Sequence, residues 1–138
     1  MPTNAPTPPP LPRWLRLVPA LIVLWLAASW PIGLALNPGR LARPGELAYL
    51  VADLAILLPL ALATAVALRR GSPRAPSLLV ATLGALAYDA THFAVRTAQE
   101  TPGGMARAGV AAGLCVLLAV IGLGIRAALR HNTGVTRI

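Results

Sequence analysis

The stretch SLLVATLGALAYDATHFAVRT, residues 77–97, is long and apolar enough to cross a membrane, yet it contains Asp89, His92 and Arg96. Its seven strongly apolar side chains favour insertion by roughly 3 kcal/mol together, whereas one central Asp opposes insertion by about 2.5–3.5 kcal/mol. The segment would barely insert alone, so its carboxylate needs shelter and a partner on neighbouring helices. This balance predicts a bundle of membrane helices with Asp89 turned toward the interior.

The composition of the whole chain agrees with a membrane protein. Of its 138 residues, 57% are hydrophobic and 12% are charged, and the mean hydropathy is +0.69. Soluble domains are typically about 25% charged, and an apolar run of about 20 residues crosses the roughly 30 Å hydrocarbon core of a bilayer. We therefore predict an all-α, polytopic transmembrane four-helix bundle in one domain, residues 13–130, with spans at about 14–36, 46–68, 77–97 and 105–129.

The two ends of the chain differ from this apolar domain. Six of the first twelve residues are proline, which lacks the N–H of a helix, so residues 1–12 are expected to form a disordered cytoplasmic tail. Residues 131–138 are expected to form a second, short cytoplasmic tail. The first apolar run continues past the sequence AAS to Leu36, longer than the usual signal-peptide core of about 7–15 residues, which indicates an uncleaved helix.

The arginines predict the orientation of the bundle. The net charge is +8, with twelve arginines, no lysine and four acids. Eight arginines flank one side of the predicted spans and four flank the other. The arginine-rich side faces the cytoplasm, so we expect both termini inside and an up-down-up-down order.

The same arginines indicate the partner and the membrane. Because they flank apolar spans, they are expected to contact anionic lipid, and the lipid bilayer rather than nucleic acid is the predicted partner. The absence of lysine beside abundant Ala, Leu, Gly and Pro is typical of a GC-rich bacterium, which places the chain in a bacterial cytoplasmic (inner) membrane.

Two of the predicted spans each contain a stripe of polar residues with the same spacing. The stripe of the span 46–68 is Glu46, Tyr49 and Asp53, and the stripe of the span 77–97 is Asp89, His92 and Arg96. Positions i, i+3 and i+7 share one face of a helix. These two spans are joined by a short loop and therefore run antiparallel. Each residue adds 1.5 Å along a helix, so two residues that are equally far from the ends opposite this loop lie at the same depth in the membrane. The stripes then pair at three depths: Glu46 with Arg96, Tyr49 with His92, and Asp53 with Asp89.

Three interpretations of these stripes remain open. They could form an internal hydrogen-bond network in which Asp89 bonds to Tyr49, His92 or backbone. They could form an outward-opening pocket for a proton, a cation or a small polar ligand, because two carboxylates at one depth in low dielectric do not both stay ionised cheaply. Asp53, Asp89 and His92 could also form a catalytic or metal site, although this spacing is a weak metal signal.

Cofactors and catalytic motifs give little support for an enzyme. His92 is the only histidine inside a predicted span, which disfavours haem, and no cofactor is expected. The sequence has no Walker loop, dinucleotide-binding glycine pattern, HExxH or nucleophile elbow. Cys115 is interpreted as a small hydrophobic residue of the last span.

A GxxxG motif, formed by Gly109 and Gly113, lies on the last predicted span. Such glycines let two helix backbones approach closely. We expect them to pack within the bundle, and the alternative is contact with a second copy in a homo-oligomer or with a larger membrane complex.

The region 51–95 resembles a loosely defined group of uncharacterised bacterial integral membrane proteins, many of them actinobacterial. The shared features are a D-L-x-x-x-L-P segment in one helix and a short arginine-rich hairpin, here Asp53, Leu54, Leu58, Pro59, Arg69 and Arg70. The resemblance covers about a third of the chain, and it implies a fold type without a chemistry. This chain lacks the Trp-Gly-Tyr that such proteins often have after the hairpin.

Two functions are therefore expected from the sequence. The first is a small, non-enzymatic membrane protein that acts as an accessory or interaction subunit with an inward polar stripe. The alternative is a component that transports or senses a proton, cation or small ligand through an outward-facing pocket of Asp53, Asp89 and His92, with Tyr49 beside them.

Overall fold

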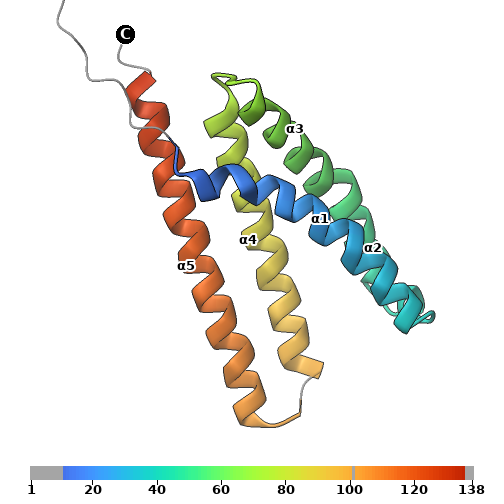
Figure 1. The fold of residues 1–138 in the computed structure, drawn as a ribbon. Coiled ribbons are helices and arrows are strands. Elements are labelled where there is room, and N and C mark those ends of the chain that lie inside the picture. The colour runs from blue at the N-terminus through green and yellow to red at the C-terminus, as the bar shows by residue number, and fades with distance from the viewer. Residues whose placement is uncertain (1–10, 101, 136–138) are drawn as a thin grey trace, which may run out of the picture.

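The computed structural model describes residues 11–100 and 102–135, and within these ranges the chain is helical and contains no strand. Four helical segments are long and apolar enough to cross a membrane, which confirms the predicted all-α membrane fold (Figure 1). They are α1 (Arg13–Leu36), the continuous segment α2 (Glu46–Ala52), η2 (Asp53–Leu57) and α3 (Leu58–Arg69), then α4 (Ala75–Glu100) and α5 (Gly104–Val135). A short 3₁₀ helix, η1 (Arg40–Ala42), lies between the first two segments.

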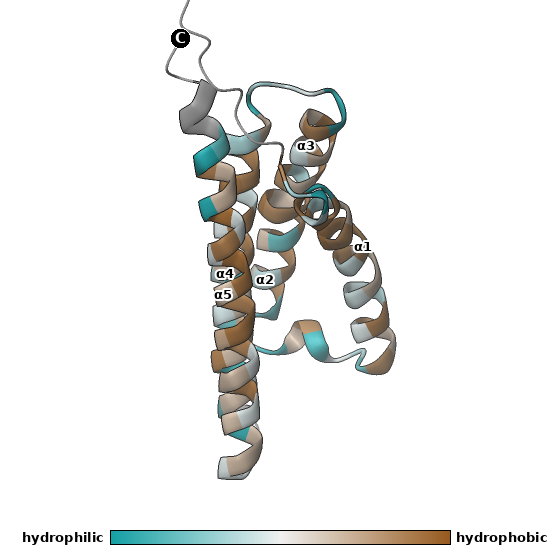
Figure 2. Cartoon of the chain, turned by 60° about the vertical axis from the view of Figure 1, so that its left-hand side comes forward, coloured by the Kyte–Doolittle hydropathy of each residue, from teal (hydrophilic) through white to brown (hydrophobic). Residues whose placement is uncertain are grey.

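Apolar residues predominate along the four helical segments, as Figure 2 shows. Large side chains such as Leu24, Trp25, Ile56 and Leu123 are more than half exposed. A protein in water rarely leaves so much apolar surface open, whereas lipid covers such a surface without cost. The chain is thus built as a multi-pass membrane protein.

The second segment changes its helical geometry in the middle. Residues Asp53–Leu57 form a π-helical turn, directly before Pro59 in the first turn of α3. Proline has no N–H and its ring collides with the carbonyl four residues earlier, so an α-helix cannot continue unchanged through it. A single π turn accommodates this conflict by including one more residue in the turn. The helix thus accommodates Pro59 through a change of turn that begins at Asp53.

Helix α1 connects two apolar clusters. At its start, Leu15 is buried against α4 and α5, and further along, Trp30 is buried against η2 and α3. In Figure 1, α1 crosses from the pair α4–α5 to the segment α2–α3. The first cluster comprises Leu15, Leu79, Leu83, Ile121 and Ala128, and the second comprises Ile22, Leu26, Trp30, Leu57 and Ala61.

Helices α3 and α4 are joined by a buried hydroxyl pair. The Oγ1 atoms of Thr64 and Thr82 are 2.7 Å apart, and both residues are fully buried. Each hydroxyl also bonds to the carbonyl four residues earlier in its own helix, Leu60 and Leu78 respectively. Hydrogen bonds of this kind hold membrane helices together. They fix the end of the α3–α4 contact that lies away from the polar stripes.

The GxxxG prediction within the bundle is wrong. A side chain added at Gly109 or Gly113 would meet nothing within 4 Å, so neither glycine packs against a helix of the described chain. Gly124 is the close-packed glycine of α5, because a Cβ there would lie 3.0 Å from both Leu15 and Leu83. Gly109 and Gly113 precede the part of α5 that meets α1, and they lie on its open face. Contact with a second copy or a partner remains a prediction.

The ends of the chain also differ from the expectation. Helix α5 continues to Val135, through much of the expected polar tail, where no proline interrupts it after residue 130. Residues 136–138 and most of the expected proline-rich tail, residues 1–10, lie outside the described residues.

Replacing Gly124 by Leu should destabilise the protein by about 1–3 kcal/mol, because the new side chain overfills the contact with Leu15 and Leu83. The matched control is Gly113→Leu, which makes the same chemical change on an open face of the same helix. The free energy of unfolding is measured by SDS titration in mixed micelles, followed by circular dichroism. Equal stability of the two variants would contradict the packing described here.

Candidate functional site

The outer boundary of the site is an ion-pair cluster around Glu46. Gly45 has a positive φ of 86° and starts α2, so Glu46 lies in the first turn, where a carboxylate is stabilised by the helix dipole. The side chain is buried, and it accepts from Arg96 at 2.6 Å and from Arg40 at 2.9 Å. The predicted pair of Glu46 with Arg96 is therefore present, and Arg40 adds a second cation that the stripe analysis did not include.

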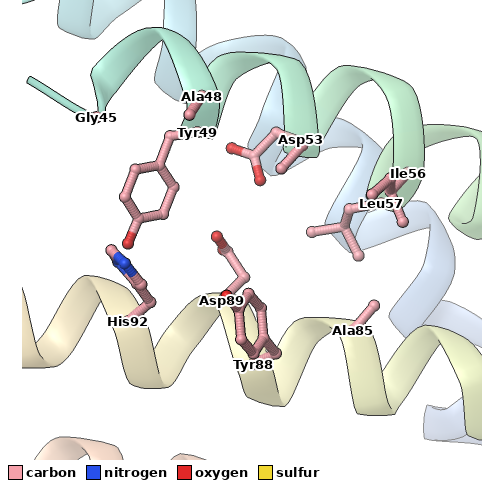
Figure 3. A pocket seen from close by; sticks show the side chains of 11 residues that line it. Gly45, Ala48, Tyr49, Asp53, Ile56, Leu57, Ala85, Tyr88, Asp89 and His92 are labelled. Carbon is pink, nitrogen blue, oxygen red and sulfur yellow. The ribbon is translucent and has the colours of Figure 1, made fainter.

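The middle depth holds Tyr49 and His92, whose ring centres are 4.4 Å apart in an edge-to-face arrangement. His92 is exposed, and its ring points from α4 toward Tyr49 (Figure 3). The Tyr49 hydroxyl is buried and has no hydrogen-bond partner among the described residues. A buried hydroxyl without a hydrogen-bond partner lowers the stability of the folded protein, especially where no water reaches it. The Tyr49 hydroxyl is therefore available to form a hydrogen bond with a ligand that enters the site.

The deepest pair is Asp53 with Asp89. Their carboxyl groups point toward one another across the space between η2 and α4, close enough to interact electrostatically (Figure 3). Asp53 is buried with 7% of its surface exposed, whereas Asp89 is half-buried. The three depths predicted from helical spacing are thus all matched in space.

Trp30 of α1 is the partner of Asp53. Its indole Nε1–H donates to Asp53 Oδ2 at 2.7 Å, and both groups are buried. The guanidinium of Arg40 lies 4.7 Å from the centre of the same indole ring. Trp30 thus links the deepest carboxylate to the ion-pair cluster at the boundary.

The equal-depth pairing of the two stripes included neither Trp30 nor Arg40. A signal for Trp30 was present, because it lies six residues before the end of α1 and Asp53 lies seven residues after the start of α2. At 1.5 Å per residue both positions are about 10 Å from the same boundary. Trp30 therefore lies at the same depth as Asp53, just as Asp89 does.

These groups surround a pocket of about 340 Å³ between the α2–η2 segment and α4 (Figure 3). The pocket exists because α4 packs directly on α3, whereas α2 diverges from α4 toward the end that carries Glu46 (Figure 1). Ala85, a small residue of α4, leaves space beside Asp89 and lines this pocket. The lining residues are Gly45, Ala48, Tyr49, Ala52, Asp53, Ile56, Leu57, Ala85, Tyr88, Asp89 and His92.

Tyr88 lines this pocket, although the spacing of the stripe did not select it. It precedes Asp89 on α4, is largely exposed, and has its ring centre 6.4 Å from that of His92. It therefore stands at the rim of the pocket.

The arrangement does not favour the third interpretation of the stripes, a metal site of Asp53, Asp89 and His92. Among the described residues, no group of three or more His, Cys, Asp or Glu side chains is placed to hold one metal ion. His92 contacts the ring of Tyr49 edge-to-face at the side of the pocket. The roles of Tyr49, Asp53, Asp89 and His92 in binding a ligand or proton remain predictions.

Comparison with known proteins gives no match: no family model, no curated protein and no solved structure is similar to this chain. The resemblance to uncharacterised bacterial membrane proteins is thus still a prediction.

Replacing Trp30 by Phe keeps the ring and removes the donor to Asp53, so a buried carboxyl group loses its partner. We expect a loss of about 1–3 kcal/mol in the free energy of unfolding. Trp25→Phe is the matched control, since Trp25 is on the same helix and is 65% exposed. If both variants unfold alike in SDS titration, the bond of Trp30 to Asp53 contributes no stability.

Proposed function

We propose that this protein binds a cation in the pocket between Asp53 and Asp89, as the sensing or transport component of a membrane system, with the proton as a competing ligand. The observation that carries the proposal is a pair of facing carboxyl groups in an otherwise apolar pocket. In low dielectric two negative charges repel strongly, and a positive charge between them removes the repulsion.

The other acidic residue of the stripes does not compete for this role. Glu46 is already neutralised by Arg40 and Arg96, so no further cation is needed there. Asp53 and Asp89 have no such cationic partner among the described residues. Asp53 is only partly satisfied by the neutral indole of Trp30. A negative charge in the membrane interior without a counter-ion is a functional signal.

Asp89→Asn should weaken cation binding at least about tenfold, which corresponds to about 1.4 kcal/mol, because the variant removes one of the two carboxyl groups that hold the cation and preserves the shape of the side chain. Trp30 reports occupancy, because it bonds to Asp53. Its emission is titrated with Na⁺, K⁺, ammonium and Ca²⁺ in nanodiscs, in full-length protein whose Trp14 and Trp25 are replaced by Phe.

Thr91→Ala on the exposed side of α4 serves as the control. Because protons compete for the same carboxylates, the apparent cation affinity should fall as the pH is lowered. Equal cation response in Asp89→Asn and the parent protein would overturn the proposal.

We also propose that the chain lies in a bacterial cytoplasmic membrane with both termini inside, in up-down-up-down order. The excess of arginine on one side of the spans supports this orientation. The pocket would then open toward the outer half of the membrane.

The orientation is tested by reporter fusions. We expect green fluorescent protein fused after Ile138 to fluoresce and alkaline phosphatase at the same point to be inactive. Phosphatase inserted after Pro44 should be active. The reverse pattern would place the pocket toward the cytoplasm.

An accessory subunit without a ligand is the second candidate function. It is favoured by α5, where Gly109 and Gly113 leave an open small-residue face that a partner helix could approach closely. A protein of this kind would show no response to cations that depends on Asp89.

A further inference from the structure

We infer that the pocket takes a monovalent organic ammonium ion of a few carbon atoms, with its nitrogen between Asp53 and Asp89 and its hydrocarbon part against Leu57 and Ala85. This inference rests on the proposed function and names the class of cation. The inference follows from the size of the pocket, the oxygen atoms that it offers and the side chains that line it.

The size of the pocket exceeds what a single inorganic ion requires. Its volume of about 340 Å³ falls within the range of small-molecule sites, about 300–1,000 Å³. One water molecule takes only about 30 Å³ of liquid, and a bare metal ion takes less. An ion alone would leave most of the pocket to be filled by water or lipid.

The pocket offers too few oxygen ligands for a hard metal ion. Ca²⁺ prefers about six to eight oxygen ligands, and Mg²⁺ about six. Here the facing carboxyl groups are the only acids that line the pocket, and one oxygen of Asp53 already accepts from Trp30. An ammonium nitrogen needs only two or three acceptors, and the free oxygens of Asp53 and Asp89 together with the unpartnered hydroxyl of Tyr49 can provide them.

The lining of the pocket is arranged in two parts around the carboxyl groups (Figure 3). On one side stand the rings of Tyr49 and His92, with Tyr88 at the rim, and aromatic rings attract ammonium groups through their negative faces. On the other side lie the aliphatic side chains of Leu57 and Ala85. This sequence of aromatic, charged and aliphatic surfaces fits an alkylamine in its protonated form.

The charge balance is consistent with one ammonium ion. Two carboxyl groups that share one proton carry a single negative charge, which one monovalent cation neutralises. The arginines of the boundary cluster are bound to Glu46 and do not line this pocket. A dication would need both carboxylates ionised and would have no other acid to complete its shell.

The test is a series of ammonium, ethylammonium and butylammonium chlorides, with Na⁺ and Ca²⁺ alongside, titrated into the full chain in nanodiscs by calorimetry and Trp30 emission. Each buried methylene should strengthen binding about fourfold, until the aliphatic end is full. The series is read on the parent protein, so it does not depend on the folding of a variant.

Ala85→Leu fills the aliphatic end, so it should weaken butylammonium at least about tenfold and change ammonium less than twofold. Ala81→Leu, one turn along α4 at an exposed position outside the pocket, is the matched control and should change neither. Binding of ammonium to both variants shows that the site is intact.

The outcomes separate the two proposals. If Na⁺ or Ca²⁺ binds in a manner that depends on Asp89 while butylammonium binds no more tightly than ammonium, the organic ligand is wrong and the cation site stands. If butylammonium binds equally to Asp89→Asn, it enters the lipid and not the pocket, and the inference is overturned. If no cation response depends on Asp89, both proposals fail.

Discussion

The burial of Asp53 within an apolar membrane-length helix is the constraint on which the rest of this structure depends. In a bilayer no water satisfies a carboxyl group, so its partners must come from other helices. Trp30 of α1 provides the hydrogen bond, and Asp89 of α4 faces it from the other side. A single acidic side chain thereby ties three of the four helical segments to one place.

The boundary cluster extends this constraint toward the membrane surface. Arg40 lies over the ring of Trp30 and also bonds to Glu46, which in turn binds Arg96. The contacts form a continuous path from Asp53 to the loop after α1 and to the end of α4. A change in charge at Asp53 would therefore alter its hydrogen bond to Trp30 and, through Trp30 and Arg40, the contacts of the loop. The second apolar cluster, which includes Trp30 and Leu57, borders the same pocket, so polar and apolar contacts together hold this part of the bundle.

Much of this arrangement could be predicted from the sequence, because membrane helices obey strict rules of length and periodicity. The four spans follow from apolar runs, and the pairing of Glu46 with Arg96 and Tyr49 with His92 follows from equal depth on antiparallel helices. Equal depth also relates Trp30 to Asp53, but depth alone does not say which side chains of α1 face α2, because the rotation of a helix about its axis is not fixed by its own sequence. Arg40 lies outside the four predicted spans, so no depth could be assigned to it.

Packing and cavity shape could not be predicted in this way. The GxxxG motif on α5 indicated a close contact, yet Gly124 makes that contact, because the crossing of α1 decides which part of α5 is covered. The pocket beside Asp89 depends on the divergence of α2 from α4, which small residues such as Ala85 permit without requiring. These features depend on the angles between helices, and those angles cannot be read from the pattern of residues along the chain.

The π turn at Asp53–Leu57 has a consequence for the tolerance of this helix to insertions and deletions. The wide turn contains one residue more than an α-helical turn, so deleting one of its residues would let it return to α-helical geometry with the flanking parts close to their present rotation. Each residue of a regular α-helix turns the chain by about 100°, so a deletion between Tyr49 and Asp53 would rotate the part of α2 before it relative to α3 by that amount. Glu46 and Tyr49 would then leave the face that meets α4, while Ala61 and Thr64 would keep their contacts. The pocket should accordingly tolerate the loss of one residue other than Asp53 from this turn better than a deletion in α2.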